Sequence, residues 1–126
     1  MTTTPTDAVT DLSCVNLSRV NLARTTLVGA DFRGAKLVGT CFNGAHLSGS
    51  DFRGADLTNA DMRYADLRGC KMTDAILEGA EFYEADLTGV DLSQVDLSGA
   101  RMERALYELK HEWPSMVANV AGGSDV

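Results

Sequence analysis

The chain has 126 residues, 44% of them hydrophobic, and a formal net charge of −7. This length predicts one domain, and the acidic balance argues against direct binding to nucleic acid or to an anionic membrane. No stretch is long and apolar enough to predict a membrane span. Residues 1–10 lack the charged start and apolar middle of a signal peptide, so a cytoplasmic location is expected.

A five-residue repeat dominates the chain after a flexible leader at residues 1–7, and it is predicted to build residues 8–102. Every fifth residue from Leu12 to Met102 is Leu, Phe or Met, without a break. A small residue precedes each by two places, and Asp most often precedes it by one. Gly usually follows it by two places, as in the unit Ala30-Asp31-Phe32-Arg33-Gly34.

A period of five fits neither a strand, in which residues five apart face opposite ways, nor an α-helix, around which the apolar column would wind. The large residues can all point inward only if the chain bends once per unit, and Gly lies where a bend needs a permissive backbone. Repetition of this step predicts a solenoid whose stacked coils share one core. The Phe and Met members occur only in alternate units, so each coil holds an even number of units.

The runs GADFRGAKL, GADLTNADMRYADLRG and EADLTGVDLSQVDLSGA resemble the pentapeptide repeat family. This resemblance implies an all-β solenoid, namely a right-handed, four-sided parallel β-helix with four units per coil. Residues 8–102 would then make about five coils. Departures from the repeat, such as Lys36, Cys41 or Ile76 in place of Asp or Asn, are mild.

A short C-terminal α-helix is predicted at residues 103–113, followed by a loose tail at 114–126. Leu106, Leu109 and Trp113 lie on one helical stripe, and Pro114 ends the pattern. This helix either caps the last coil, because an open solenoid end exposes core and strand edge, or docks onto a second copy. At the other end, either the leader crosses the opening or the N-terminal ends of two rods meet. A homodimer through one end of the rod is expected.

The outward positions offer no convergent catalytic set, no metal-ligand spacing and no phosphate loop, so no enzyme activity, metal or cofactor is predicted. The surface feature above background is Tyr64 with Tyr83, expected on neighbouring coils of one side with Arg63 and Glu84 alongside. Exposed Tyr and Arg are typical of protein-binding surfaces. The alternative interpretation is ordinary aromatic packing between coils.

Three functions are compatible with this pattern. The first is a rigid, non-catalytic protein-interaction module with an unknown partner. The second follows from the resemblance, because some pentapeptide repeat proteins mimic duplex DNA and bind DNA gyrase or topoisomerase IV in quinolone resistance. The stacked acidic residues that would serve this role are Asp31, Asp51 and Asp91, although arginines and Lys71 interrupt them. The third, an accessory domain of an enzyme, is the least favoured.

Overall fold

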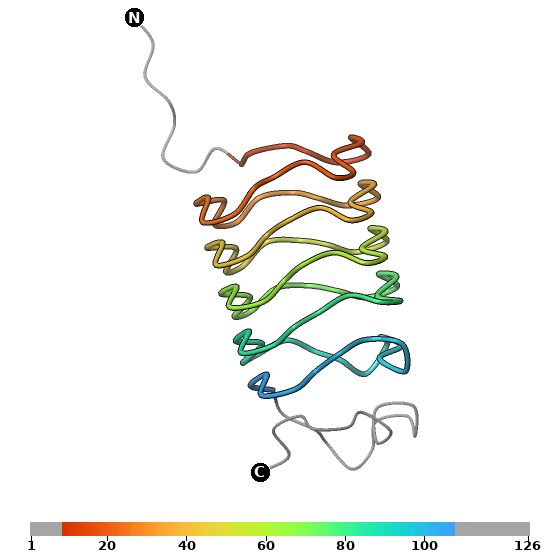
Figure 1. Cartoon of the computed structure of the whole chain (residues 1–126). Helices are drawn as coiled ribbons and strands as arrows, with labels where there is room; N and C mark the ends of the chain where they lie inside the picture. The colour runs from red at the N-terminus through yellow and green to blue at the C-terminus, as the bar shows by residue number, and fades with distance from the viewer. Residues whose placement is uncertain (1–8, 108–126) are drawn as a thin grey trace, which may run out of the picture.

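The computed structural model of the chain describes residues 9–107. These residues form a stack of coils that runs from the first described residues, in red, to the last described ones, in blue (Figure 1). Parallel bridges join residues twenty apart, from Asp11–Asp31 to Asp86–Leu106. Each coil therefore holds four five-residue units. The described residues contain no helix, and their strands are isolated bridges of one residue.

Each unit has five positions, named here on Ala30-Asp31-Phe32-Arg33-Gly34: small, outer, centre, first turn and second turn. The centre carbonyl of Phe32 accepts a hydrogen bond from the N–H of Ala35 at 3.0 Å, which closes a four-residue turn. Gly34 has φ +66°. A positive φ at the third residue of such a turn is the mark of a type II turn and explains the preference for Gly. The bend therefore falls where the five-residue spacing predicts it.

Three hydrogen bonds per unit tie neighbouring coils together. The N–H of Asp51 donates to Ala30 O at 2.9 Å, and Asp51 O accepts from the N–H of Phe32 at 2.8 Å. The N–H of Gly34 donates to Arg53 O at 3.0 Å. Since every coil repeats this ladder on its four sides, side chains twenty residues apart lie one above another. The sides are named here after Phe32, Leu37, Phe42 and Leu47, the centres of the second coil.

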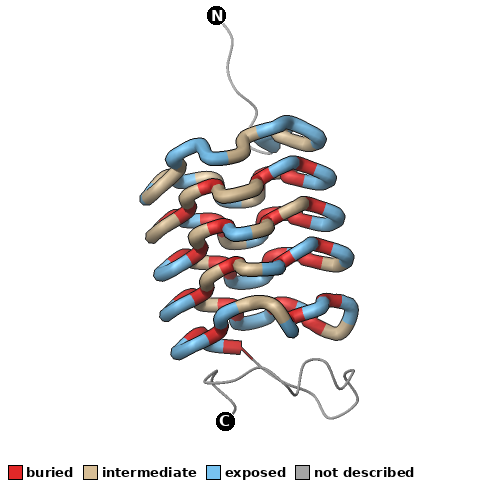
Figure 2. Tube along the Cα trace, turned by 45° about the vertical axis from the view of Figure 1, so that its right-hand side comes forward, coloured by how far each residue is buried: buried red, intermediate tan, exposed pale blue. Residues whose placement is uncertain are grey.

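The core consists of the centre and small positions, which lie on the inside of the coils (Figure 2). Phe32 and Phe52 stack with ring centroids 4.7 Å apart, and Phe42 from the opposite side meets Phe32 edge-to-face at 5.7 Å. Phe and Met centres thus lie only on two opposite sides, and Leu fills the other two as far as Leu97, as the alternation by ten predicts. Such complementary packing gives the narrow core its density.

Polar residues at the small position are accommodated by hydrogen bonds to the preceding coil. Thr40 and Ser50 are completely buried, and their hydroxyls donate to Leu17 O and Leu27 O, both at 2.8 Å. Cys70 Sγ lies 3.0 Å from Leu47 O, and burial raises the pKa of this thiol to about 12. The departures from Ala therefore leave the core intact, because each polar atom is satisfied.

The ladder is interrupted on two sides of the last described coil. Asp91 and Asp96 form no bridge with the coil before, although the bridges resume at Arg101 and Leu106. The N–H of Gly79 bonds Gly99 O at 2.8 Å, one residue beyond the position that the repeat requires. The turns at Gln94 and Gly99 also lack the positive φ of the other turns. In Figure 1 the blue-green corners of this stretch are wider than those above.

The predicted helix at 103–113 is wrong in its first part, because the repeat continues beyond Met102. Arg104 has φ 61°, which no α-helix tolerates, and the N–H of Ala105 closes another turn onto Met102 O at 3.0 Å. Leu106 takes an outer position and bridges to Asp86, with its side chain half exposed, and Tyr107 takes the buried centre. Residues 108–113, with Leu109 and Trp113, lie outside the described residues, as do the leader 1–7 and the tail 114–126.

Candidate functional site

The outer Asp residues have a structural role, because their side chains accept hydrogen bonds from the backbone of the turn. Asp31 Oδ1 accepts a hydrogen bond from the N–H of Arg33, two residues on, at 3.0 Å. The same short loop recurs in eleven units, at Asp11, Asn16, Asn21, Asp31, Asp51, Asp56, Asp61, Asp66, Asp86, Asp91 and Asp96. Asp and Asn side chains favour such turns because they satisfy a backbone donor at the bend. These carboxylates are therefore structural in the first place.

Four of these carboxylates also bind an arginine of their own unit. The Arg33 guanidinium donates from Nε and Nη2 to the two oxygens of Asp31, at 2.9 and 2.8 Å. These bonds hold the pKa of Asp31 at about 2, below its ordinary value. Equivalent bonds from arginine lower the pKa of Asp51, Asp61 and Asp66. Each of these acids stays ionised, and its charge is neutralised by the guanidinium beside it.

The acidic column expected on the Phe32 side is therefore discontinuous. Asp31 and Asp51 are each paired with an arginine at 2.8 and 2.6 Å, and Arg33 also reaches Asp51 at 4.0 Å. Lys71 bridges to Asp51 and separates it from the level of Asp91, where the ladder is interrupted. A DNA-like surface requires like charges at regular spacing. On this side, arginines neutralise Asp31 and Asp51, and Lys71 reverses the sign of the column at the next level.

The two predicted tyrosines are in contact. Tyr64 and Tyr83 meet edge-to-face with ring centroids 5.7 Å apart, and their exposed fractions are 54% and 36%. The Arg104 guanidinium lies 6.0 Å from the centre of the Tyr83 ring, and its Nε donates to Glu84 Oε2 at 2.6 Å. Arg63 is 2.8 Å from Asp61 and 3.7 Å from Glu81. We call Tyr64, Tyr83, Arg63, Glu84 and Arg104 the tyrosine cluster.

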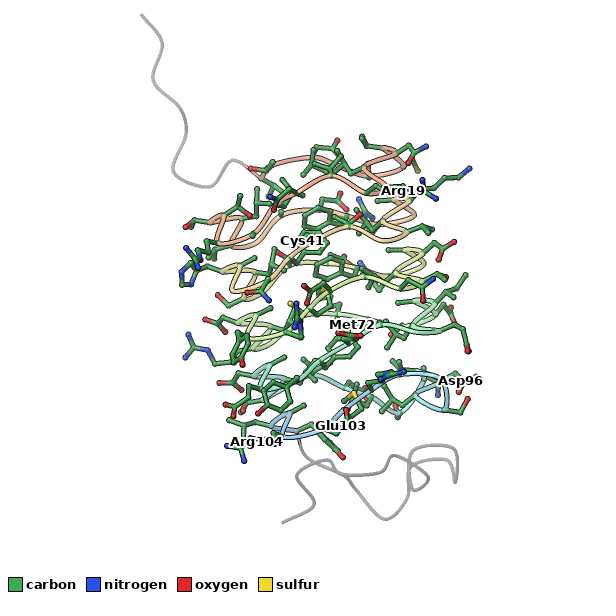
Figure 3. All side chains as sticks on the ribbon, in the orientation of Figure 1. Arg19, Cys41, Met72, Asp96, Glu103 and Arg104 are labelled. Carbon is green, nitrogen blue, oxygen red and sulfur yellow. The ribbon has the colours of Figure 1, made fainter. Side chains whose placement is uncertain are left out.

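The backbone holds three members of the cluster at one corner of the rod. Tyr64, Glu84 and Arg104 occupy the second turn position in successive coils, with φ 63°, 58° and 61°. Glycine occupies this position in most of the other units and suits it without steric cost. A bulky residue in the left-handed region is strained. Figure 3 shows Arg104 at this corner, on the opposite flank of the rod from Asp96.

The sequence predicts the neighbouring positions of Tyr64 and Tyr83 and places Arg63 and Glu84 beside them. The turn position of Arg104 was not predicted, because the apolar residues of 103–113 also have the spacing of an amphipathic helix. The overlooked signal is Ala105-Leu106-Tyr107, which repeats the small, outer and centre pattern with Tyr in place of Leu, Phe or Met. Leu106, predicted to lie on the capping helix, lies instead on the outer surface of the Leu47 side.

The side that carries the cluster, named after Phe42, has no net charge, with acids and bases equal in number. Within residues 9–107, no group of three or more His, Cys, Asp or Glu side chains is arranged to hold a metal ion. No helix in the same range is long and apolar enough to cross a membrane.

Comparison with known proteins shows the family. The family model for pentapeptide repeats matches residues 10–49, 42–74 and 72–104. The chain belongs to the pentapeptide repeat family, whose members fold as right-handed, four-sided β-helices. The described coils have this architecture, as the resemblance implied. No curated protein matches the chain significantly.

Several solved structures share the fold. A pentapeptide repeat protein from the thylakoid lumen of Arabidopsis thaliana is 32% identical, with TM-score 0.64, over 82% of this chain and 67% of that one. A pentapeptide repeat protein from Nostoc PCC 7120 is 28% identical, with TM-score 0.56, over 89% and 84%. The plasmid-mediated fluoroquinolone resistance protein QnrB1 is 17% identical, with TM-score 0.52, over 88% and 60%, a likeness of fold alone. Since one of these proteins is lumenal, the cytoplasmic location stays a prediction.

Proposed function

We propose that this protein is a rigid, non-catalytic interaction module whose tyrosine cluster binds another protein. The observation that supports this most is Tyr64, an exposed aromatic side chain at a strained corner where the fold favours glycine. Other non-glycine residues also take a positive φ at this position, and Tyr64 is the aromatic one among those that the structure describes. The stacked backbone fixes the cluster before binding, which lowers the entropy that association must overcome.

The contact that we propose is aromatic rather than electrostatic. The charges around the tyrosines are already paired, Arg104 with Glu84 inside the cluster and Arg63 with neighbouring acids outside it. The side has no net charge. Tyr and Arg are the residues that most often contribute strongly to protein interfaces. We expect binding that changes little with salt, because long-range attraction contributes little to a neutral surface.

The alternative is a DNA mimic that binds gyrase or topoisomerase IV through Asp31, Asp51 and Asp91. The net charge of −7 supports it. The arginines bound to Asp31 and Asp51 weaken it, because a basic DNA groove would meet neutralised carboxylates. A domain that assists an enzyme has no specific support in the described residues.

The test compares partner capture by the wild type and by the double variant Tyr64→Ala/Tyr83→Ala. The variant should lose the captured protein, with binding at least about ten-fold weaker. The matched control is Val28→Ala/Ile76→Ala, which removes side chains that are 60% and 50% exposed on other parts of the rod. Equal loss in both variants, or retention in both, would contradict a role for the cluster. Circular dichroism checks that all the variants remain folded.

A gyrase supercoiling assay at low and moderate salt distinguishes the alternative. Our proposal predicts no inhibition at micromolar protein. Inhibition that salt relieves, and that Asp31→Asn/Asp51→Asn/Asp91→Asn abolishes, would instead favour the DNA mimic. The two arms use different variants, so each function can fail without affecting the other.

A further inference from the structure

The first described coil has a ring of backbone groups that find no partner among residues 9–107. In later coils the outer residue directs both its N–H and its C=O toward the coil before, as Asp51 does toward Ala30 and Phe32. Among residues 9–107, no coil lies before the first one, and the N–H groups of its outer residues form no hydrogen bond within this range. These residues are Asp11, Asn16, Asn21 and Thr26.

The area inside this ring is apolar and incompletely covered. The first-coil centres are partly buried, unlike the completely buried centres of the second coil, and they are Leu12, Leu17, Leu22 and Leu27. Val9, Val15 and Val20 are exposed beside them. Figure 2 shows the same contrast, since the coil nearest the N-terminus lacks the buried residues that every later coil contains.

Charge is low at this end of the rod. The outer residues of the first coil are one Asp, two Asn and one Thr, whereas all four are Asp in the third coil. Arg19 and Arg24 run toward the second coil, with each Cγ 3.5 Å from the place that a Cβ on Gly39 or Gly44 would occupy. A further coil could therefore stack on this end with little like-charge repulsion.

We propose that two copies of this chain stack through their N-terminal coils, related by a two-fold axis perpendicular to the rods. Such an axis makes the facing strands antiparallel. In an antiparallel hydrogen-bonded pair, two opposite residues exchange both of their N–H···O bonds. The first-coil outer residues present both groups on the same edge, so this edge is complementary to itself. A two-fold interface closes at the dimer and buries both apolar ends.

The position of the two-fold axis is restricted by Asp11, the single charged residue of the ring. Placement of Asp11 opposite its own copy would bring two carboxylates close together, at a cost in free energy. The other positions of the axis set Asp11 opposite Asn or Thr of the second copy, where a carboxylate can accept a hydrogen bond. The dimer leaves the tyrosine cluster exposed, so it is independent of the proposed partner surface.

Sedimentation velocity on the full chain, from about 1 to about 100 μM, tests the dimer. The variant Asn16→Lys/Asn21→Lys/Thr26→Lys places three lysines on the edge and should weaken dimerisation about ten-fold or more. The matched control Cys41→Lys/His46→Lys gives the second coil three lysines in the same columns, together with Lys36. It should dimerise like the wild type, because these charges are one coil away from the interface.

A second variant controls for loss of the turns at Asn16 and Asn21. The side chains of these residues accept hydrogen bonds from the N–H groups of Ser18 and Ala23. Asn16→Asp/Asn21→Asp keeps these acceptors and adds negative charge to the edge, and it should also weaken the dimer. Hydrogen exchange should show amides 11, 16, 21 and 26 protected only at high protein concentration. A monomer at every concentration would overturn the proposal, whether residues 1–8 cover the edge or leave it open. A dimer unaffected by both edge variants would also overturn it.

Discussion

At the scale of single residues, two local requirements account for most of the repeat. The second turn residue needs a positive φ, which favours Gly, and the bend leaves a backbone N–H that an outer Asp or Asn accepts. Both requirements can be predicted from the five-residue spacing, because each residue type falls at a fixed distance from an inward Leu or Phe. The binding of arginines to Asp31 and Asp51 could not be predicted, because spacing alone does not show which way a long side chain turns.

We predict that Gly49→Ala destabilises the protein more than Gly99→Ala does. Gly49 has φ +71° and no atom within 4 Å of an added Cβ, so the cost is purely that of the backbone, about 1 kcal/mol. Gly99 lacks the positive φ, and an added methyl would meet only the carboxylate of Glu78, which can move. Urea unfolding of both variants gives the two free energies. Equal costs would mean that turn conformation does not control stability.

At the scale of the element, the unit and its place in the coil determine what each substitution does. The inward and outward positions could be assigned from the sequence, because large residues five apart can share a core only if the chain bends. The number of units per coil came from the family resemblance, and the bridges between residues twenty apart agree with it. The interruption at Asp91–Gly99 could not be predicted, and nothing in the structure explains why the register shifts there.

The hydrogen bonds between coils also explain why the solenoid extends beyond Met102, where a helix was predicted. Met102, Ala105 and Leu106 satisfy a helical period and the five-residue repeat at once. The repeat prevails because its hydrogen bonds are supplied by the coil before, through Leu106 N–H to Ala85 O and Leu87 N–H to Leu106 O. An isolated helix of this length would lack such support. Tertiary pairing thus outweighs local propensity at this position.

We predict that Phe52→Ala lowers the free energy of unfolding by about 3–5 kcal/mol, because it opens a cavity in a dense core. Phe52 is completely buried and packs against Phe32 and Phe42. Asp56→Ala is the matched outward change, and it should cost about 1 kcal/mol through loss of the bond from the Thr58 N–H. Chemical denaturation measures both values. Similar costs at the two positions would contradict the division into inward and outward residues.

At the scale of the whole molecule, the rod is a sum of coils, each of which contacts only its neighbours. Within residues 9–107, the first and last coils therefore differ from the middle ones, since each has one neighbouring coil instead of two. The first coil shows this in its partly buried leucines. Charge is also unequal along the rod, with most of the excess acids in residues 70–107.

We predict that amide hydrogen exchange in the wild type is slow where the ladder between coils is complete and faster where it is interrupted. The N–H groups of Asp51, Asp56, Asp61 and Asp66 are bonded to the coil before, and they should exchange most slowly. Amides around Asp96, where no bridge forms, should exchange faster by at least about ten-fold. Exchange followed by mass spectrometry on peptides from each coil measures this. Uniform protection would show that the rod opens only as a whole.

Because residues twenty apart are stacked, position along the chain also sets the direction that a side chain faces. Removal of twenty residues would shorten the rod by one level and leave every remaining column aligned. Removal of five residues between Tyr64 and Tyr83 would keep all inward positions inward, yet turn everything downstream by a quarter of a revolution. The downstream Phe and Met centres would then lie over Leu centres, and the two rings would part onto adjacent sides. A lineage of such proteins could therefore rearrange its surface by a change of length, while a small and a large residue still occupy the inward positions of every unit.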